Sequence, residues 1–380
     1  MIEQTFQKYF GNCDGMVTSI APGRVNLIGE YTDYNQGFVL PTTIDKAIYL
    51  AVRKRLDHTC ILHSLNFKAS TTFTLDHLIK DNANPWANYI KGVLQVLQNA
   101  GHQFRGIEGT IYGDIPIGAG LSSSAALEIA TINALQHLFD LPLSPLTMIQ
   151  LAQQAENTFV GMRCGIMDQF VSLLGRQNCA LFIDCLNLQH SLVPLNLAQH
   201  CLLIINSKIK HELVSSAYNE RREQCEEGVK YFHALDHNIT SLRQVSPQLF
   251  ANHRTKLNPV IERRCQHIIT ENTRVLQAVA SLRASNMEQL GQLFYASHLS
   301  LKNDYETSCK EIDLIVDTAQ EHGALGARIT GGGFGGCAIV LTTKDLAITL
   351  ANTISEKYQQ KIGFYPEIMK LDKNLEAKIV

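Results

Sequence analysis

The sequence predicts an α+β protein of two domains. Its 380 residues exceed the size of one typical domain, so two hydrophobic cores are expected. Short β-branched segments between Gly, Pro and Asn dominate the first half, whereas long charged segments with a 3.6-residue apolar period dominate the second. A strand-rich half followed by a helix-rich half is typical of α+β domains. We place the boundary between residues 187 and 200, which gives domains 1–190 and 191–380.

The first half is expected to alternate strands with helices. Three helix patterns are present: 86–101, which ends at Gly101, 122–139, which is apolar on almost every side, and 146–159, which follows Pro145. The strand patterns, in chain order, cover 16–23, 24–30, 46–55, 60–67, 71–76, 107–118, 179–185 and 200–206.

The second half becomes helical from about residue 211. Charged segments with helical periodicity cover 215–235 and 285–305. The chain then closes with a strand at 336–341, a helix at 345–360 and a strand at 366–371. This closing pattern predicts a second sheet with helices packed on it.

Charge and composition exclude several classes of protein. Lys and Arg total 33 and Asp and Glu total 35, so neither nucleic acid nor an anionic membrane is an expected partner. The start, MIEQTFQKYF, lacks the features of a signal peptide, and no apolar run approaches the roughly 18–20 residues that span a membrane. Ten scattered cysteines without a C-x-x-C pair indicate reduced thiols, so we expect a cytoplasmic protein.

A serine–glycine loop, GDIPIGAGLSSSAALEIA, lies between a predicted strand and a predicted buried helix. The first N–H groups of a helix lack partners within it, and the helix dipole is positive at that end. Gly118 and Gly120 allow the backbone to approach a ligand, and Ser122, Ser123 and Ser124 add hydroxyls. The stretch therefore predicts a phosphate cradle, although it lacks the Gly-Lys ending of a Walker A loop. A serine-capped helix after a glycine turn is the structural alternative.

Two carboxylates follow in the stretch AENTFVGMRCGIMDQF. Glu156 has apolar neighbours late in a predicted helix, and Asp168 lies between Met167 and Phe170 after a glycine turn. Acidic residues in apolar surroundings are rarely unpaired, so one is a candidate cation ligand and the other a candidate base. The structural alternatives are a glutamate on a helix surface and an aspartate that caps a helix.

A polar cluster lies near the N-terminus in APGRVNLIGEYTDYNQGFVLP. Arg24, Asn26, Glu30, Asp33 and Asn35 occur on a segment that glycines interrupt. Closely spaced donors and acceptors suit a polyhydroxylated ligand, and an arginine can bind an anion through two hydrogen bonds. A polar hairpin is the alternative, because DYNQG is favourable turn chemistry.

A glycine run, GARITGGGFGGCAIV, places five glycines within residues 331–336. Glycine is costly to order, so the run is either a flexible linker or a backbone that approaches something closely. Strand-like residues on both sides favour a turn over a linker. We expect this loop to close over a ligand site opposite the serine loop, with Phe334 as its packing anchor. A tight hairpin without a ligand is the alternative.

Together these segments resemble the GHMP small-molecule kinases, and among them the galactokinase family. GRVNLIGEYTDYNQGFVLP resembles the galactokinase signature, PIGAGLSSSAA the family's phosphate motif and ARITGGGFGGCAIV its C-terminal glycine motif. CGIMDQF and KHELVSSAYNERREQCE are similar to two further galactokinase stretches. The five motifs occur in the family's order between about residues 20 and 340.

The resemblance implies a fold, a reaction and a set of site residues. The fold has an N-terminal domain like ribosomal protein S5, a ferredoxin-like C-terminal domain, and the active site between them. The reaction transfers the γ-phosphoryl group of ATP to the C1 hydroxyl of galactose with Mg²⁺ as cofactor. Asp168 and Arg24 match catalytic positions. The sugar-binding positions are Glu30, Tyr31, Thr32, Asp33, Gly165 and Tyr218. The nucleotide-binding positions are Ser64, Trp86, Gly118, Ala119, Gly120, Leu121, Ser122, Ser123 and Ser124. The Mg²⁺ ligands are Ser124 and Glu156.

One position departs from the family. Galactokinases usually show Glu-His-Thr-Asp, whereas this chain has Tyr31 in the second place. Tyrosine is larger than histidine and cannot perform imidazole chemistry. If the Tyr31 side chain reaches the sugar, selectivity near the C6 hydroxyl differs from that of the family; if only its backbone does, little changes.

Two other functions are compatible with the resemblance. One is a galactose and ATP sensor without turnover, and the other is a GHMP kinase for a related sugar. The intact Asp168, Arg24 and GLSSSAA favour the enzyme over the sensor. The expected partners are galactose and ATP, and the expected assembly is a monomer or a weak homo-oligomer.

Overall fold

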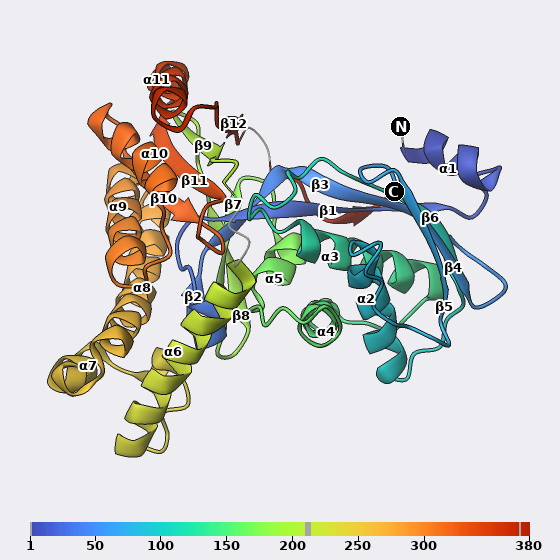
Figure 1. The fold of residues 1–380 in the computed structure, drawn as a ribbon, viewed down its shortest axis with the longest axis horizontal. Helices are drawn as coiled ribbons and strands as arrows, with labels where there is room; N and C mark the ends of the chain where they lie inside the picture. The colour runs from blue at the N-terminus through green and yellow to red at the C-terminus, as the bar shows by residue number, and fades with distance from the viewer. Residues whose placement is uncertain (1, 210–213, 372–373) are drawn as a thin grey trace.

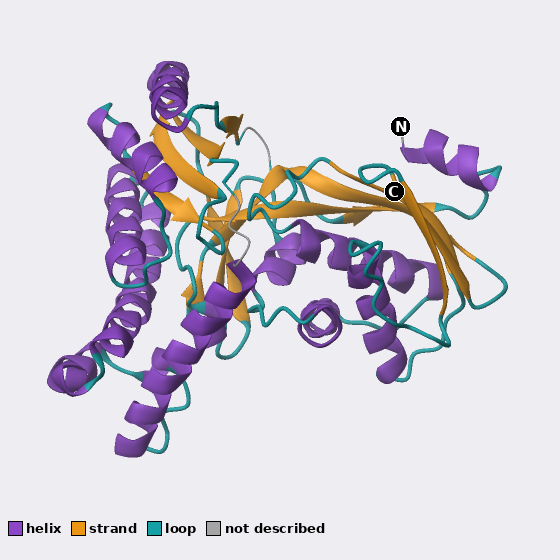
Figure 2. Cartoon of the chain, viewed as in Figure 1, coloured by secondary structure: helices purple, strands orange, loops and turns teal. Residues whose placement is uncertain are grey.

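The computed structural model describes residues 2–209, 214–371 and 374–380. The chain forms two lobes, each built on one sheet and covered by helices (Figures 1 and 2). The α+β fold predicted from the sequence is therefore confirmed. No helix in the described part of the chain is long and apolar enough to cross a membrane.

The first lobe contains a six-stranded sheet in the order β13-β1-β3-β6-β4-β5. All neighbours are antiparallel except β4 and β6, which run parallel. The strand β13 returns the C-terminus to the edge of this sheet, beside β1. The strands are β1 (Val17–Asn26), β3 (Pro41–Lys54), β4 (Thr59–Ser64), β5 (Ala69–Thr74), β6 (Ile107–Gly113) and β13 (Lys378–Ile379).

Helices cover both faces of this sheet (Figure 1). The central helix α3 (Ser123–Phe139) packs on β1 and β3 and is buried along most of its length, as its apolar composition predicts. The other helices on that side are α2 (Ala87–Asn99), α4 (Pro145–Gln154), the π-helical turn η2 (Ala155–Val160) and α5 (Met167–Leu174). The opposite face carries α1 (Ile2–Phe10), which contacts β3 and β6.

The second lobe contains a four-stranded antiparallel sheet in the order β10-β11-β9-β12. The strands are β9 (His200–Asn206), β10 (Gly326–Thr330), β11 (Cys337–Thr343) and β12 (Glu367–Lys370). Helices separate the first strand from the second and the third from the fourth, so the lobe has the βαββαβ order of a ferredoxin-like fold. The helices are α6 (Val214–Leu235), α7 (Pro247–His253), α8 (Pro259–Arg283), α9 (Met287–Asn303), α10 (Lys310–Glu321) and α11 (Lys344–Ile362).

A small sheet lies where the lobes meet. It pairs β2 (Phe38–Val39) with β7 (Cys179–Asp184) and β7 with β8 (Gln189–Pro194). The long helix α8 contacts both β2 and β8. The polar segment at residues 26–37, which joins β1 to β2, is thus held between the lobes and includes a single 3-10 turn, η1 (Asp33–Asn35).

The structure differs from the sequence prediction in several elements, among them β2 and β8, which no predicted element covers. The strands predicted at 16–23 and 24–30 are one strand, β1, which continues through Pro22 with a shift of register and ends at Asn26. The helix predicted at 146–159 is regular only to Gln154, and wider π-helical hydrogen bonding follows. The N-terminal helix α1 was not predicted. Part of the KHELVSSAYNERREQCE motif, residues 210–213, lies outside the described residues.

Candidate active site

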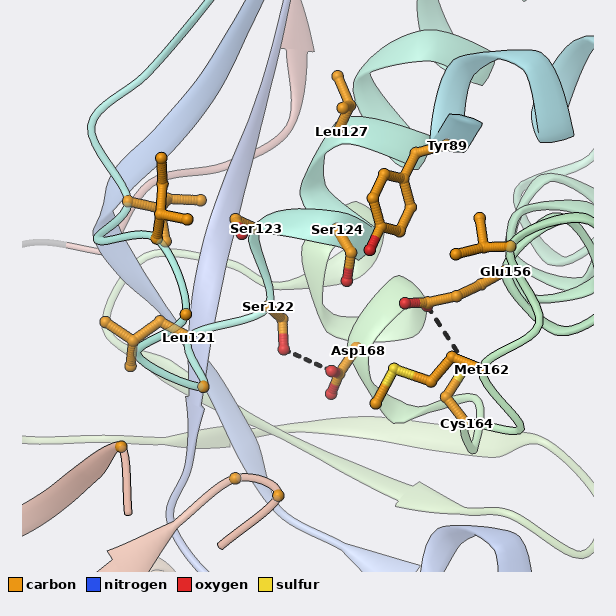
Figure 3. A pocket seen from close by; sticks show the side chains of 18 of the residues that line it. Tyr89, Leu121, Ser122, Ser123, Ser124, Leu127, Glu156, Met162, Cys164 and Asp168 are labelled. Atoms are coloured by element: carbon orange, nitrogen blue, oxygen red, sulfur yellow. Dashed lines mark hydrogen bonds between the residues drawn. The ribbon is translucent and has the colours of Figure 1, made fainter. Parts of the chain in front are cut away.

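A cavity of about 900 Å³ opens between the lobes. It is lined by the polar segment, the serine–glycine loop, the π-helical turn, α6 and the glycine run, which are far apart in the sequence. Figure 3 shows Ser122, Ser124, Glu156 and Asp168 directed toward a common space. The sequence motifs therefore converge on one pocket.

The serine–glycine loop enters α3 through three residues with left-handed backbone. Gly118, Gly120 and Ser122 have φ values of 73°, 74° and 60°. Ser122 precedes the first residue of α3, but its side chain does not cap the helix. The N–H groups of the first helical turn are thus left for a ligand. The serine-capped helix that the sequence allowed is not what this loop forms.

Asp168, in the first turn of α5, is held by two groups from other elements. Arg24 of β1 donates from Nε to Oδ1 at 2.7 Å and from Nη2 to Oδ2 at 2.8 Å. Ser122 donates its hydroxyl to Oδ2. Arg24 also donates from Nη1 to the carbonyl of Gly120 at 2.8 Å. One arginine thus joins the carboxylate to the serine–glycine loop, and Asp168 does not cap its helix as the alternative proposed.

Glu156 lies on the π-helical turn and is 3% exposed, so it is not a glutamate on a helix surface. Its Oε2 accepts from Gln169 at 2.8 Å and from the Cys164 thiol at 3.3 Å. Burial and the charge of Asp168 raise the pKa of Glu156, and a hydrogen bond with Ser124 opposes the shift. Extra turns of the π type are frequent at functional sites.

A second buried carboxylate, that of Glu128, lies near Glu156 and was not identified from the sequence. Gln169 also donates to Glu128 Oε2 at 2.9 Å, so its amide bridges the two glutamates. Burial and Glu156 raise the pKa of Glu128 well above its ordinary value. Glu128 lies in α3 only four residues after Ser124, but no sequence pattern distinguished it from other helical residues.

Asp33 faces Asp168 across the pocket. It accepts from its neighbour's backbone, Tyr34 N, at 2.9 Å. Burial and the charge of Asp168 raise the pKa of Asp33 to about 6. Gly165 lies directly against the carboxylate, since a Cβ at that position would overlap the Asp33 oxygens. The turn before α5 therefore requires glycine because Asp33 occupies the side-chain position.

Glu30 is buried, with an exposed fraction of 2%, and residues of the second lobe bind its carboxylate. Its carboxylate accepts from Gly331 N at 3.0 Å and Thr330 Oγ1 at 3.2 Å, and pairs with the buried Arg328. Burial raises the pKa of Glu30, and Arg328 opposes that shift. Arg328 was not identified from the sequence because nothing in GARIT indicates an ion pair with a residue about 300 positions earlier.

The glycine run forms the loop between β10 and β11, as predicted. Gly331, Gly333, Gly335 and Gly336 all have positive φ. A Cβ on Gly331 would lie 2.7 Å from the carbonyl oxygen of Gly120, so this loop touches the serine–glycine loop backbone to backbone. Phe334 is held by a 2.7 Å hydrogen bond from its N–H to Thr307 O. The run is therefore a close-approach turn that lines the pocket, which confirms the predicted turn and rules against a linker.

The far end of the pocket is aromatic. The Trp86 and Phe67 rings are nearly parallel, at 6°, with centroids 6.5 Å apart. Both rings line the pocket, as do Ser64 and Tyr89. Phe67 was missed because a single aromatic residue in a turn carries no distinguishing pattern.

Most of the predicted site residues line the pocket, and two do not. Gly118, Gly120, Leu121, the three serines, Gly165, Tyr31 and Tyr218 all line it. Thr32 is fully buried and donates its hydroxyl to the carbonyls of Gly29 and Phe38, so it holds the turn rather than facing the pocket. Ala119 is also buried, behind the loop's surface.

Family models match three parts of the chain. They are described as the N-terminal domain of GHMP kinases, over residues 88–176, the C-terminal domain of GHMP kinases, over 278–360, and the galactokinase galactose-binding signature, over 4–54. The matched ranges contain the serine–glycine loop, the glycine loop and the polar segment respectively.

Named relatives extend these matches over nearly the whole chain. A galactokinase of Streptococcus mutans is 39% identical over 96% of this chain and 94% of its own, and one of Clostridium acetobutylicum is 40% identical over 91% and 90%. The crystal structure of Lactococcus lactis galactokinase complexed with galactose superposes with a TM-score of 0.95, at 35% identity, covering 99% and 98% of the two chains. Methanococcus jannaschii mevalonate kinase, at 19% identity and a TM-score of 0.66, shares the fold.

The fold, the three loops and these matches define the class: the chain belongs to the GHMP kinase family. Identity of 39–40% with the curated relatives over at least nine-tenths of the chain then places it, within that family, among the galactokinases.

Proposed function

We propose that this protein transfers the γ-phosphoryl group of ATP to the C1 hydroxyl of D-galactose, producing galactose 1-phosphate and ADP. The observation that carries the proposal is the position of Asp168, which faces the polar segment on one side and is tied to the serine–glycine loop through Arg24 and Ser122 on the other. The similarity to a galactokinase bound to galactose supports the same sugar here.

The sugar is proposed to lie against the polar segment. Carboxylates accept hydrogen bonds from hydroxyls, and Asp33 presents such a group to the pocket beside Glu30, whose carboxylate also holds the glycine loop. Because Gly165 has no side chain, the Asp33 carboxylate fits beside it, and Tyr218 forms part of the wall of the pocket. Thr32, although it matches the family's sugar-binding positions, contributes by holding the turn between these residues.

The triphosphate is proposed to lie on the serine–glycine loop. Free N–H groups at the start of α3, with the positive end of its dipole, favour bound phosphate. Left-handed backbone at Gly118, Gly120 and Ser122 presents the loop's own N–H groups, as in other anion-binding turns. The base is proposed to bind at the aromatic end, beside Trp86 and Ser64, with Phe67 as an additional contact.

Ser124 and Glu156 fit a Mg²⁺ ion. Both are oxygen donors that line the pocket, and Glu156 is a buried carboxylate whose pKa is raised by burial and by Asp168. A divalent cation there would satisfy that charge, and Mg²⁺ binds with few protein ligands while keeping several waters. When bound, the ion supplies charge neutralisation for the phosphates. Gln169 and Cys164 orient the Glu156 carboxylate through their hydrogen bonds.

Phosphoryl transfer depends on alignment and charge stabilisation. Asp168 is positioned to accept a hydrogen bond from the attacking sugar hydroxyl and hold it in line with the γ-phosphorus. As the new P–O bond forms and the bond to ADP breaks, the hydroxyl proton leaves toward the carboxylate. Arg24 keeps that carboxylate in place through two hydrogen bonds. Because ATP is the donor, we propose a cytoplasmic setting.

The test is a kinase assay with ATP and a panel of sugars, in which the product is identified by ³¹P NMR. We expect ADP and galactose 1-phosphate, with kcat/KM for galactose at least about tenfold above that for glucose, its C4 epimer, and for N-acetylgalactosamine. Galactose binding without ADP formation would instead support the sensor. The highest kcat/KM for another sugar would support a kinase for that sugar.

A further inference from the structure

Tyr31 is the residue at which this chain departs from the galactokinase pattern, and it occupies an unusual position. It has a left-handed backbone, with φ of 66°, although it is a large aromatic residue. Its side chain lines the pocket but is only 5% exposed. Its hydroxyl donates to the carbonyl oxygen of Gly332 at 2.5 Å. The side chain therefore points at the glycine loop of the second lobe.

The Tyr31 ring is fixed by other aromatic rings. Tyr305, Tyr218 and Tyr34 surround it, with centroids 4.6, 5.5 and 6.3 Å away. A ring packed on several sides has little freedom to move, so the position of its hydroxyl oxygen beside the glycine loop is fixed. The hydrogen bond to Gly332 is thus made from a fixed oxygen position.

We propose that Tyr31 is a positioning residue that holds the glycine loop, Gly331–Gly336, in place over the pocket. This proposal rests on the proposed kinase function, and it assigns the Tyr31 hydroxyl to the loop instead of to the sugar.

Two consecutive residues of the polar segment bind consecutive residues of the loop. Glu30 accepts from Gly331 N and Tyr31 donates to Gly332 O. Because C=O and N–H point in opposite directions across a planar trans peptide, the Tyr31 bond also directs the N–H of Gly333 away from Tyr31. A glycine-rich loop has many accessible conformations, so each such bond selects strongly among them.

The Tyr31 hydroxyl has no proton free for a sugar. A phenol carries one proton, which is donated to Gly332, and its oxygen also hydrogen-bonds with the Thr307 side chain. Burial raises the pKa of Tyr31, so the hydroxyl stays protonated and keeps this donation. A Cβ on Gly333 would lie 3.0 Å from the same oxygen, which shows that the loop covers it closely.

The experiment compares Tyr31→Phe with Tyr34→Phe by hydrogen–deuterium exchange of the full-length protein without ligands. Tyr34 is the matched control, because its hydroxyl bonds to Tyr305 at 2.6 Å within the same aromatic cluster and does not touch the loop. Tyr31→Phe is expected to speed exchange of amides in residues 331–336 at least about fivefold, and Tyr34→Phe to leave them unchanged. Tyr31→Leu, which also lacks the hydroxyl, is the second variant and is expected to behave as Tyr31→Phe.

Kinetics provide the second readout. Tyr31→Phe is expected to lower kcat about tenfold, with KM for galactose within about twofold of wild type and the ranking of sugars unchanged. Unchanged exchange at 331–336 in both Tyr31 variants would overturn the proposal. A raised KM with a changed sugar ranking would also overturn it, in favour of direct sugar contact. Failure of the kinase function itself would appear separately, as inactivity of the wild-type protein, while the exchange comparison would still decide the role of Tyr31.

Discussion

At the scale of single residues, burial and charged neighbours act differently on the individual carboxylates of the pocket. Asp33, Glu156 and Glu30 are carboxylates whose pKa values burial raises. Asp168 instead receives two hydrogen bonds from Arg24 and one from Ser122. Desolvation favours the neutral form of an acid, whereas an arginine partner favours the ionised form. The pocket therefore combines two carboxylates that an arginine pairs, Asp168 and Glu30, with two that respond to pH or to a bound cation, Asp33 and Glu156.

The raised pKa of Asp33 predicts a pH-dependent affinity for sugar. Above about pH 6 the carboxylate is ionised and accepts from sugar hydroxyls; as pH falls through 6 it gains a proton and loses acceptor capacity. KM for galactose is expected to rise about tenfold between pH 7.5 and pH 5. Asp33→Asn, which is neutral throughout, should show a high KM with no such rise. Steady-state kinetics across this range measure both, and a wild-type KM independent of pH would contradict the role.

The site could be predicted from the sequence only where residues carry a pattern. Arg24, Asp168 and the serines belong to motifs, and the structure brings them together, although their roles stay predictions. Glu128 and Arg328 carry no pattern of their own. Each becomes notable only because the fold buries it beside Gln169 or Glu30, and one sequence does not show such distant pairs.

At the scale of elements, short loops with special backbone build the site. The glycine loop and the serine–glycine loop approach so closely that a Cβ on Gly331 would lie 2.7 Å from Gly120 O. Flanking strand patterns made the turn predictable. The π-helical turn that carries Glu156 could not be predicted, because one extra residue per turn leaves the helical periodicity almost unchanged.

Gly332 tests whether the loop serves the ligand or only the fold. It is not among the glycines with positive φ, and a Cβ there would meet no atom within 4 Å. Gly332→Val is therefore expected to keep Tm within about 2 °C of wild type while lowering kcat/KM at least about 10²-fold, because the side chain fills the pocket. Gly331→Val is the control: its φ of 81° and its contact with Gly120 predict loss of both. Equal losses of stability and activity in Gly332→Val would favour a purely structural turn.

For the whole molecule, the candidate active site exists only where the lobes meet. Asp33 and Asp168 belong to the first lobe, whereas the glycine loop and Tyr218 belong to the second. Buried hydrogen bonds hold the two lobes together. Glu271 of α8 accepts from Gly29 N at 2.9 Å, and His267 contacts Glu30 O at 3.2 Å. The strand-rich and helix-rich halves predicted the α+β class. The domain boundary near residue 190 stays a prediction, since β13 returns the last residues to the first sheet.

The central claim is that Asp168 aligns the sugar hydroxyl for phosphoryl transfer, and kcat of Asp168→Asn measured with galactose and ATP tests it most directly. Trp86, the chain's single tryptophan, provides the control, because it lies at the end of the pocket proposed to bind the nucleotide base and its fluorescence can follow an ADP titration. We expect kcat to fall at least about 10²-fold while the ADP titration stays unchanged. A folded variant that binds ADP normally and retains near wild-type kcat would contradict the account.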